Sequence, residues 1–285
     1  MQRVVYTNSR GQSVELKSSA PFLLESIGGL GDVDADIQTQ KAPFQDGSTY
    51  IDSVLQERAI SLEIAIIASD KPTLLQQRQY LASVFNPKLG PGTLRYENGE
   101  TIREIEAVPD GVPVFPSGRE NRGPIFQKAL INLICPNPYW KSTEITEEPT
   151  FEPLFQFPFE GVFEIGIQRD KRIIVNDGDA PAPLQIEFHG PAINPVIMNK
   201  TTGEFIKVNQ TLQEGEVMKI DTTPGKKSVY FVQTDGSERN VFNWIDLNST
   251  FFQLVVGENE IEYSADSDIQ GAIVNIRYNK LYNAV

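Results

Sequence analysis

Apolar residues at every second position mark the clearest strand of the N-terminal half. Within Ala59–Ala68, alternate residues from Ile60 to Ile66 are apolar and the intervening ones include Ser61 and Glu63. This period of two predicts a half-buried strand. Nearer the N-terminus, two short β-prone runs stand on either side of a turn rich in polar residues and glycine, which predicts a hairpin of 3–7 with 13–16.

One helix is predicted directly after the alternating segment. Ser69-Asp70-Lys71-Pro72-Thr73 supplies residues that start helices, and a proline in the first turn loses no hydrogen bond. Asn86-Pro87 ends the helix, because the residue before a proline avoids the α region. Five apolar residues fall on one face of it: Leu74, Leu75, Leu81, Ala82 and Phe85.

A second hairpin and a long loop follow. Thr93–Tyr96 and Thr101–Ala107 lie on either side of Asn98-Gly99, the dipeptide most typical of tight hairpin turns. Pro109–Pro124 is rich in Pro, Gly and charge, and loops of this length in a compact domain are usually functional or mobile. Phe126–Cys135 is apolar on both faces, so we expect it at the centre of a sheet.

The chain changes character at residues 141–170, where glutamates and prolines mix with a series of phenylalanines. We interpret this stretch as an interdomain segment. The aromatic side chains either pack onto a sheet face or form a subunit contact. They are Phe151, Phe155, Phe157, Phe159 and Phe163.

Short strands separated by Gly, Asn and Asp turns make up the rest of the chain, which is typical of an antiparallel β-sandwich. The predicted strands are Ile173–Val175, Leu184–Phe188, Pro195–Met198, Phe205–Val208, Val217–Ile220, Val229–Val232, Phe251–Val256, Glu260–Tyr263 and Ala272–Tyr278. Gly257-Glu258-Asn259 is predicted as a turn. We therefore expect a mainly β protein with an N-terminal domain over 1–140, an interdomain segment over 141–170 and a C-terminal sandwich over 171–285.

Composition supports a globular protein and argues against several functions. The 285 residues suffice for about two domains, and 40 % are hydrophobic. The 38 acidic residues against 25 basic ones give a net charge of −13, which argues against nucleic-acid binding through an overall positive field. A single cysteine excludes internal disulfides and cysteine-based zinc sites.

Catalytic and metal-binding motifs are not found. His189, the one histidine, ends a predicted strand, and no G-x-S-x-G motif accompanies it. Asp32 and Asp34 alternate as in a calcium-binding EF-hand loop, but Ile37 stands where that loop needs glycine. Pairs of carboxylates suited to glycoside hydrolysis stay open, because no linear motif selects one. We expect no enzyme activity, no cofactor and no metal site.

The best local candidate for sugar binding is Trp244 with Asn243 and Asp246, an aromatic ring beside polar groups. The competing interpretation places Trp244 in the core or against a hairpin. Residues 1–25 show no basic segment followed by an apolar one, and no apolar stretch is long enough to span a bilayer. We therefore expect a soluble protein made in the cytoplasm, without membrane insertion.

Several stretches, in order along the chain, carry a resemblance to a known family. They are Lys41–Ser48, Arg58–Leu62, Phe85–Gly92, Phe126–Ala129 and Cys135–Trp140, then Asn176–Asp179, Pro181–Pro183, Thr202–Glu204, Phe252–Leu254 and Gly257–Asn259. The C-P-N-P-Y-W stretch is the most specific of them. On these residues the sequence resembles the distal tail (Dit) protein family of long-tailed bacteriophages and prophages.

The resemblance implies a structural protein of the virion tail tip or baseplate, assembled in the bacterial host cytoplasm. Family members form a homohexameric ring from an N-terminal β-sandwich domain with an added hairpin and helix, and carry a galectin-like C-terminal β-sandwich. The ring joins the tail tube protein to the trimeric tail-tip hub protein, and some members anchor receptor-binding proteins. Longer relatives carry inserted carbohydrate-binding modules, for which this chain has no room.

Three segments are candidates for subunit contacts, because a closed ring needs projecting segments. They are the acidic Leu30–Gln40 loop with Asp32 and Asp34, the Asn98-Gly99 hairpin turn, and the Pro109–Pro124 loop with Arg119 and Arg122. The negative charge has two open explanations: it keeps viral DNA from sticking to the channel wall of a ring, or it serves solubility alone. An accessory protein that binds carbohydrate through the C-terminal sandwich is the alternative function, and a cell-wall hydrolase is a third.

Overall fold

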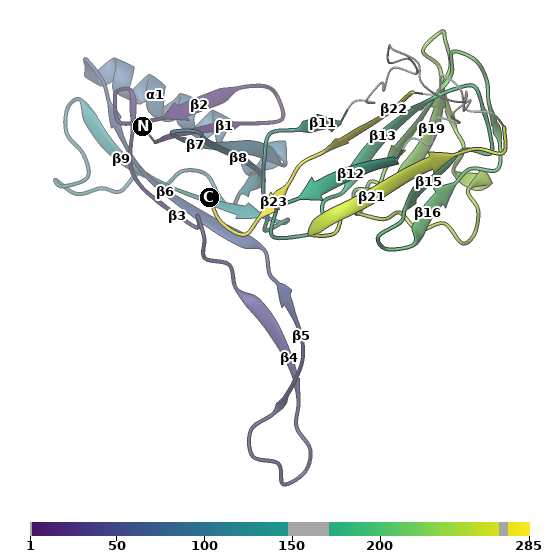
Figure 1. Cartoon of the computed structure of the whole chain (residues 1–285). Coiled ribbons are helices and arrows are strands. Elements are labelled where there is room, and N and C mark those ends of the chain that lie inside the picture. The colour runs from purple at the N-terminus through teal and green to yellow at the C-terminus, as the bar shows by residue number, and fades with distance from the viewer. Residues whose placement is uncertain (1, 148–170, 268–272) are drawn as a thin grey trace, which may run out of the picture. The chain divides into compact units, whose positions relative to one another are not determined.

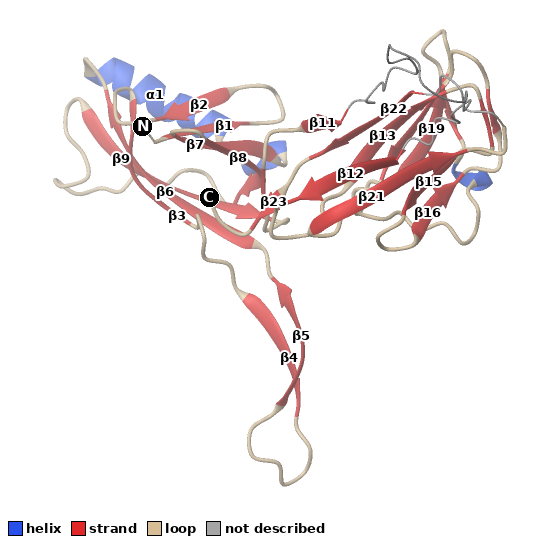
Figure 2. Ribbon diagram, viewed as in Figure 1, coloured by secondary structure: helices blue, strands red, loops and turns tan. Residues whose placement is uncertain are grey.

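The computed structural model describes residues 2–147, 171–267 and 273–285 of the chain. The expected phenylalanine-rich segment therefore lies almost wholly outside the described residues. The chain divides into two compact units, one of Met1–Thr143 with Tyr282–Val285 and one of Glu144–Leu281. The mainly β fold predicted from the sequence is confirmed: the described residues form many strands and one α-helix (Figure 2).

The first unit contains ten strands, one α-helix and one 3-10 helix in its continuous part. They are β1 (Arg3–Thr7), β2 (Ser13–Leu16), β3 (Phe22–Gly28), β4 (Ala35–Gln40), β5 (Thr49–Leu55), β6 (Arg58–Ile67), α1 (Lys71–Val84), η1 (Pro87–Leu89), β7 (Gly92–Asn98), β8 (Thr101–Pro109), β9 (Phe126–Cys135) and β10 (Trp140–Lys141). Seven of them run side by side in the order β2-β1-β7-β8-β9-β6-β3. The two predicted hairpins, β1–β2 and β7–β8, both form.

In the strands of the first unit, alternate side chains point inward and form the hydrophobic core. Ile60, Leu62, Ile64 and Ile66 of β6 are all buried, as their period of two predicts. β9 lies between β8 and β6, as expected, but the prediction that it is apolar on both faces is wrong. Its alternate residues are exposed or only half-buried, so one face of this strand is open.

Helix α1 begins where its capping residue predicts. The Asp70 carboxylate accepts a hydrogen bond from the Thr73 backbone N–H at 2.8 Å, which satisfies one of the free donors of the first turn. Leu74 and Leu81 are buried, and the ring of Phe85 stacks on Tyr6 with centroids 4.5 Å apart. Leu75, predicted on the same face, is instead half exposed and lines a surface hollow with Arg78 and Phe115.

The second unit is built from two antiparallel sheets. The larger has the order β11-β22-β13-β18-β19-β20 and the smaller the order β12-β21-β15-β16. The elements are β11 (Ile145–Glu147), β12 (Lys171–Asn176), β13 (Leu184–His189), β14 (Ala192–Ile193), β15 (Val196–Asn199), β16 (Glu204–Lys207), β17 (Thr211–Leu212), β18 (Val217–Asp221), β19 (Ser228–Val232), β20 (Glu238–Asn240), η2 (Phe242–Trp244), β21 (Gly257–Ser264) and β22 (Ile273–Tyr278). The last strand, β23 (Leu281–Tyr282), pairs with β10 of the first unit's sheet.

Two predictions for this unit are wrong. Phe251–Val256 is not a strand: it makes one isolated bridge, between Leu254 and Ala182. Gly257-Glu258-Asn259 is not a turn but the start of β21. The reason is Asn259, whose buried side-chain amide donates to the carbonyl of Val255 at 2.8 Å and accepts from its N–H at 2.9 Å. A residue type typical of turns here ties down the preceding chain from inside the core.

The reactivity of Cys135, the last residue of β9, tests how tightly this end of the strand is packed. Its thiol is fully buried, and burial raises the pKa of Cys135 to about 12. We expect no reaction with a thiol reagent at pH 8 in the folded protein and complete reaction after denaturation. The variant Ser117→Cys, with an exposed position, is the positive control. Rapid labelling of native Cys135 would contradict the packing described here.

Candidate assembly interface

The β4–β5 hairpin is the most unusual element of the first unit. It leaves the sheet between β3 and β6 and projects as a separate arm (Figure 1). Among the described strands, β4 and β5 pair only with each other. The prediction of an acidic loop over Leu30–Gln40 is therefore wrong for the second half of that segment, because Ala35–Gln40 is a strand. The pairing was not predicted because neither strand has a buried face to produce a hydrophobic period.

Large apolar side chains are exposed along this hairpin. Ile37 and Val54 are 61 % and 52 % exposed, and they project from opposite faces because their cross-strand partners are Ser53 and Asp36. Tyr50 and Ile51 are also more than half exposed. Apolar side chains on both faces of a free hairpin are typical of a segment that another protein surface covers.

The tip of the hairpin presents a fully exposed aromatic ring. Phe44 has a φ of 63°, a left-handed conformation that bulky residues rarely adopt. The surrounding turn holds it there: the N–H of Gln45 donates to the carbonyl of Ala42 at 3.2 Å, and the N–H of Ala42 donates to the Gln45 side chain at 3.0 Å. Backbone outliers of this kind cluster at functional segments, so the hairpin tip is a candidate contact site.

A buried arginine fixes the root of the hairpin. Arg58, the first residue of β6, is only 1 % exposed. Its guanidinium donates to three backbone carbonyls: Gly29 at 2.8 Å, Pro138 at 2.7 Å and Asn283 at 2.5 Å. Desolvation lowers the pKa of Arg58, and the Asp32 carboxylate opposes this shift. One side chain thus joins both ends of the hairpin to the C-terminal residues of the chain.

The C-P-N-P-Y-W stretch forms the pocket around this guanidinium. Pro138 supplies one of the three carbonyls, and Trp140 is fully buried with its ring centre 6.0 Å from the Arg58 guanidinium carbon. The ring of Tyr96 is close to that of Trp140, with the two ring centres 6.3 Å apart. The most specific stretch of the sequence is therefore the support of the hairpin root.

Close backbone approach reinforces the root. Gly29 has a φ of +86°, and a Cβ atom there would lie 2.1 Å from the carbonyl oxygen of Ala59, so only glycine fits. The N–H of Gln56 donates to the carbonyl of Asp34 at 2.8 Å and closes the two legs of the hairpin. Asp32 and Asp34, predicted as contact residues, thus lie exposed in the leg leading to β4.

The other predicted contact residues lie on separate loops. Asn98 and Gly99 form the exposed turn between β7 and β8, and Gly99 has a φ of 63°. Arg119 and Arg122 are exposed in the loop after β8, which lies along β9 through the bridge of Val114 with Leu130. Within 2–147, no hydrogen bond or ion pair joins these residues to Asp32 or Asp34. Their role in subunit contacts stays a prediction.

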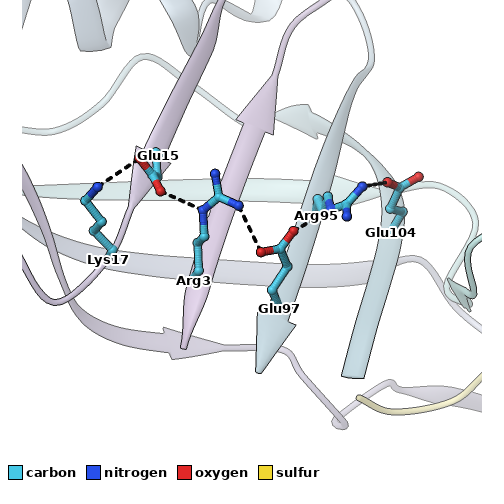
Figure 3. A network of polar contacts seen from close by, with 6 residues as sticks. All are labelled: Arg3, Glu15, Lys17, Arg95, Glu97 and Glu104. Atoms are coloured by element: carbon cyan, nitrogen blue, oxygen red, sulfur yellow. Dashed lines mark hydrogen bonds and ion pairs between the residues drawn. The ribbon is translucent and has the colours of Figure 1, made fainter. Parts of the chain in front are cut away.

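The outer face of the first unit carries a ladder of alternating charges (Figure 3). It crosses β2, β1, β7 and β8 through five contacts of 2.6–3.2 Å. The ladder consists of Lys17, Glu15, Arg3, Glu97, Arg95 and Glu104. Three cations and three anions cancel, so the excess negative charge of the chain lies elsewhere.

Acid is expected to weaken this ladder. Hydrogen bonds from Lys17 and Arg3 lower the pKa of Glu15, and those from Arg3 and Arg95 lower that of Glu97. Because both folded-state values lie below the unfolded ones, their contribution is complete above the unfolded pKa and is lost as the pH falls through the folded pKa. The pairs are solvent-screened, so the effect is under about 1 kcal/mol.

Denaturant unfolding between pH 7 and pH 3 measures this contribution. The double variant Glu15→Gln/Glu97→Gln should lose less stability on acidification than the wild type. Glu57→Gln/Glu100→Gln makes the same change of charge at exposed positions outside the ladder and should follow the wild-type profile. Parallel profiles for all three proteins would show that the ladder adds nothing measurable.

In the second unit, the predicted sugar-binding residues fall in and after η2. Trp244 is 39 % exposed, and the guanidinium carbon of Arg239 lies 5.5 Å from its ring centre. Asn243 is exposed, whereas the carboxylate of Asp246 accepts hydrogen bonds from the backbone and side chain of Asn248. That backbone bond is the main cause that lowers the pKa of Asp246. Sugar binding at Trp244 stays a prediction.

Comparison with known protein families identifies the family of the chain. The phage tail protein RIFT-related domain family matches residues 9–135, and the C-terminal domain family of siphovirus-type tail components matches residues 177–282. The chain belongs to the siphophage distal tail (Dit) family. No curated protein sequence matches it. Within the described residues, no helix has the length and apolar character of a membrane span.

Solved Dit and baseplate structures share the fold. The Dit protein of phage SPP1, described as a hub of the adsorption apparatus in phages infecting Gram-positive bacteria, is 14 % identical with a TM-score of 0.68, over 99 % of both chains. Two chains from the activated phage P2 baseplate, with calcium and with strontium, are each 10 % identical over 97 % of both chains, with TM-scores of 0.58 and 0.55. The chain is thus a Dit-like tail component.

Proposed function

We propose that this Dit protein forms a hexameric ring at the distal end of the tail tube, and that the β4–β5 hairpin makes the contact between neighbouring copies. The observation that carries the proposal is the pair of oppositely facing apolar side chains, Ile37 and Val54, on a hairpin with no covering partner among the described strands. A ring closes through head-to-tail contacts, in which the hairpin of one copy packs against a different surface of the next.

The proposed partners follow from the place of such a ring in the virion. One face of the ring meets the tail tube protein and the other the trimeric tail-tip hub protein, and the ring supports receptor-binding proteins for host attachment. Viral DNA passes through the central channel without being bound. Asp32, Asp34, Asn98, Gly99, Arg119 and Arg122 are proposed contact positions on the ring. The protein is assembled into the virion in the host cytoplasm.

The proposed role is mechanical, not enzymatic. Family membership favours a tail scaffold over a carbohydrate-binding accessory protein. Cys135 is too deeply buried to act as a nucleophile, and burial raises its pKa further. The β4–β5 hairpin exposes both polar and apolar side chains along its length, which suits a structural protein that binds neighbouring proteins.

Native mass spectrometry of the purified chain tests the ring. The expected main species has six times the chain mass of 31.8 kDa, and its share should rise with protein concentration. If the chain stays a monomer at every concentration measured, or forms no species larger than a dimer, that result would contradict a self-assembling ring.

A further inference from the structure

The outer face of the larger sheet of the second unit contains a hollow with a volume of about 280 Å³. Its floor is the backbone of two paired strands, β13 at Gln185–Glu187 and β18 at Lys219–Asp221. Arg277 of β22 forms one wall, and Tyr230 of β19 forms the other. This volume lies just below the range of about 300–1,000 Å³ that is typical of small-molecule sites, which suits a ligand as small as one monosaccharide.

The charges that line the hollow balance each other. Glu187 forms ion pairs with Arg277 and, at 3.8 Å, with Lys219. Asp221 supplies the second negative charge, and one of its oxygens accepts the N–H of Thr223 at 2.7 Å. Two cations thus face two anions, so a charged ligand meets as much repulsion as attraction. The lining favours a neutral ligand.

Three polar side chains in the hollow have hydrogen-bonding capacity to spare. Gln185, Ser228 and Tyr230 line it and make no side-chain hydrogen bond to the described part of the chain. Together with the charged groups they offer both donors and acceptors at neighbouring positions of four strands. Tyr230 also presents an aromatic ring, which gives the apolar face of a flat ring a surface to pack on.

We propose that this hollow, called the sheet groove below, binds a neutral saccharide. Sugar hydroxyls both donate and accept, which matches the mixed lining. Glu187 and Asp221 accept hydrogen bonds from sugar hydroxyls, Arg277 and Lys219 donate hydrogen bonds to hydroxyl oxygens, and Tyr230 packs against the pyranose ring. The site is distinct from Trp244 and does not depend on ring formation. In a tail component, such a groove gives the second unit a site for neutral glycans on the host surface.

Saturation-transfer difference NMR on the full chain tests the sheet groove. The probes are glucose, galactose, rhamnose, N-acetylglucosamine and N-acetylgalactosamine, with glucuronate as a charged comparison. We expect saturation transfer to at least one neutral sugar and weaker transfer to glucuronate. Tyr230→Ala and Gln185→Ala should each lower the affinity, by roughly tenfold for the aromatic ring. Trp244→Ala, at the other candidate site, should leave it unchanged.

Thermal unfolding of each variant separates loss of binding from loss of fold. If Tyr230→Ala melts below the wild type, Gln185→Ala decides, because the Gln185 side chain is exposed and its loss does not disturb the core. Three results would overturn the proposal: no transfer to any neutral sugar, transfer that survives in the groove variants, or transfer that disappears in Trp244→Ala. Preferred binding of glucuronate would overturn the neutral class of ligand.

Discussion

Replacing Arg58 with alanine is expected to lower the free energy of unfolding of the first unit by about 3–5 kcal/mol. The variant leaves the carbonyls of Gly29, Pro138 and Asn283 without their donor inside a buried pocket. Each unsatisfied buried group costs about 1–3 kcal/mol, and the cavity next to Trp140 adds to the loss. The removal of a desolvated charge offsets only part of it.

The two tryptophans make this effect measurable unit by unit. Trp140 lies in the first unit and Trp244 in the second. Denaturant unfolding followed by the fluorescence of Trp140, in a Trp244→Phe background, should show the loss. Arg95→Ala removes a half-buried, solvent-screened arginine from the charge ladder and should cost under about 1 kcal/mol. An Arg58→Ala protein as stable as Arg95→Ala would contradict the structural role of the buried guanidinium.

The hairpin variant Ile37→Ser/Phe44→Ser/Val54→Ser is expected to abolish ring assembly while leaving the fold intact. In the folded chain all three side chains are exposed, so their loss changes stability by only a few tenths of a kcal/mol each. At an interface, each buried apolar side chain contributes about 1.5 kcal/mol or more. Together the three substitutions should weaken assembly by roughly 10³-fold.

A matched variant of the second unit controls for exposure and hydrophobicity. Ile173→Ser/Val175→Ser/Leu247→Ser removes three side chains that are 69 %, 49 % and 101 % exposed. Light scattering should show the hairpin variant as a monomer and the control variant as a hexamer, with equal melting temperatures. Assembly that survives in the hairpin variant, or fails equally in both, would contradict a contact made by the hairpin.

Local patterns predicted the elements that have a buried face or a cap. The alternation of Ile60 to Ile66 predicted β6, Asp70 predicted the start of α1, and Asn98-Gly99 predicted the turn between β7 and β8. Each signal is local because the residues that produce it lie within one element. The mainly β fold of the chain followed from these elements and the regular turns of the second half.

The hairpin that we propose as the assembly interface could not be predicted in the same way. Every residue of β4 is exposed, so its sequence contains no hydrophobic period, and only its backbone pairing with β5 defines it. The support of the hairpin root is equally hidden: Arg58 contacts Asn283, 225 residues further along the chain. From the sequence alone, an arginine in a strand is expected to be exposed. Only the structure shows the three carbonyl groups that allow Arg58 to be buried.

Cryo-electron microscopy of the assembled protein tests the central claim most directly. We expect six copies around one axis, with Ile37 and Val54 of each β4–β5 hairpin buried against the neighbouring copy and Arg58 still enclosed at the hairpin root. A particle in which the hairpins point into solvent, or in which the second unit alone makes the contacts between copies, would contradict it.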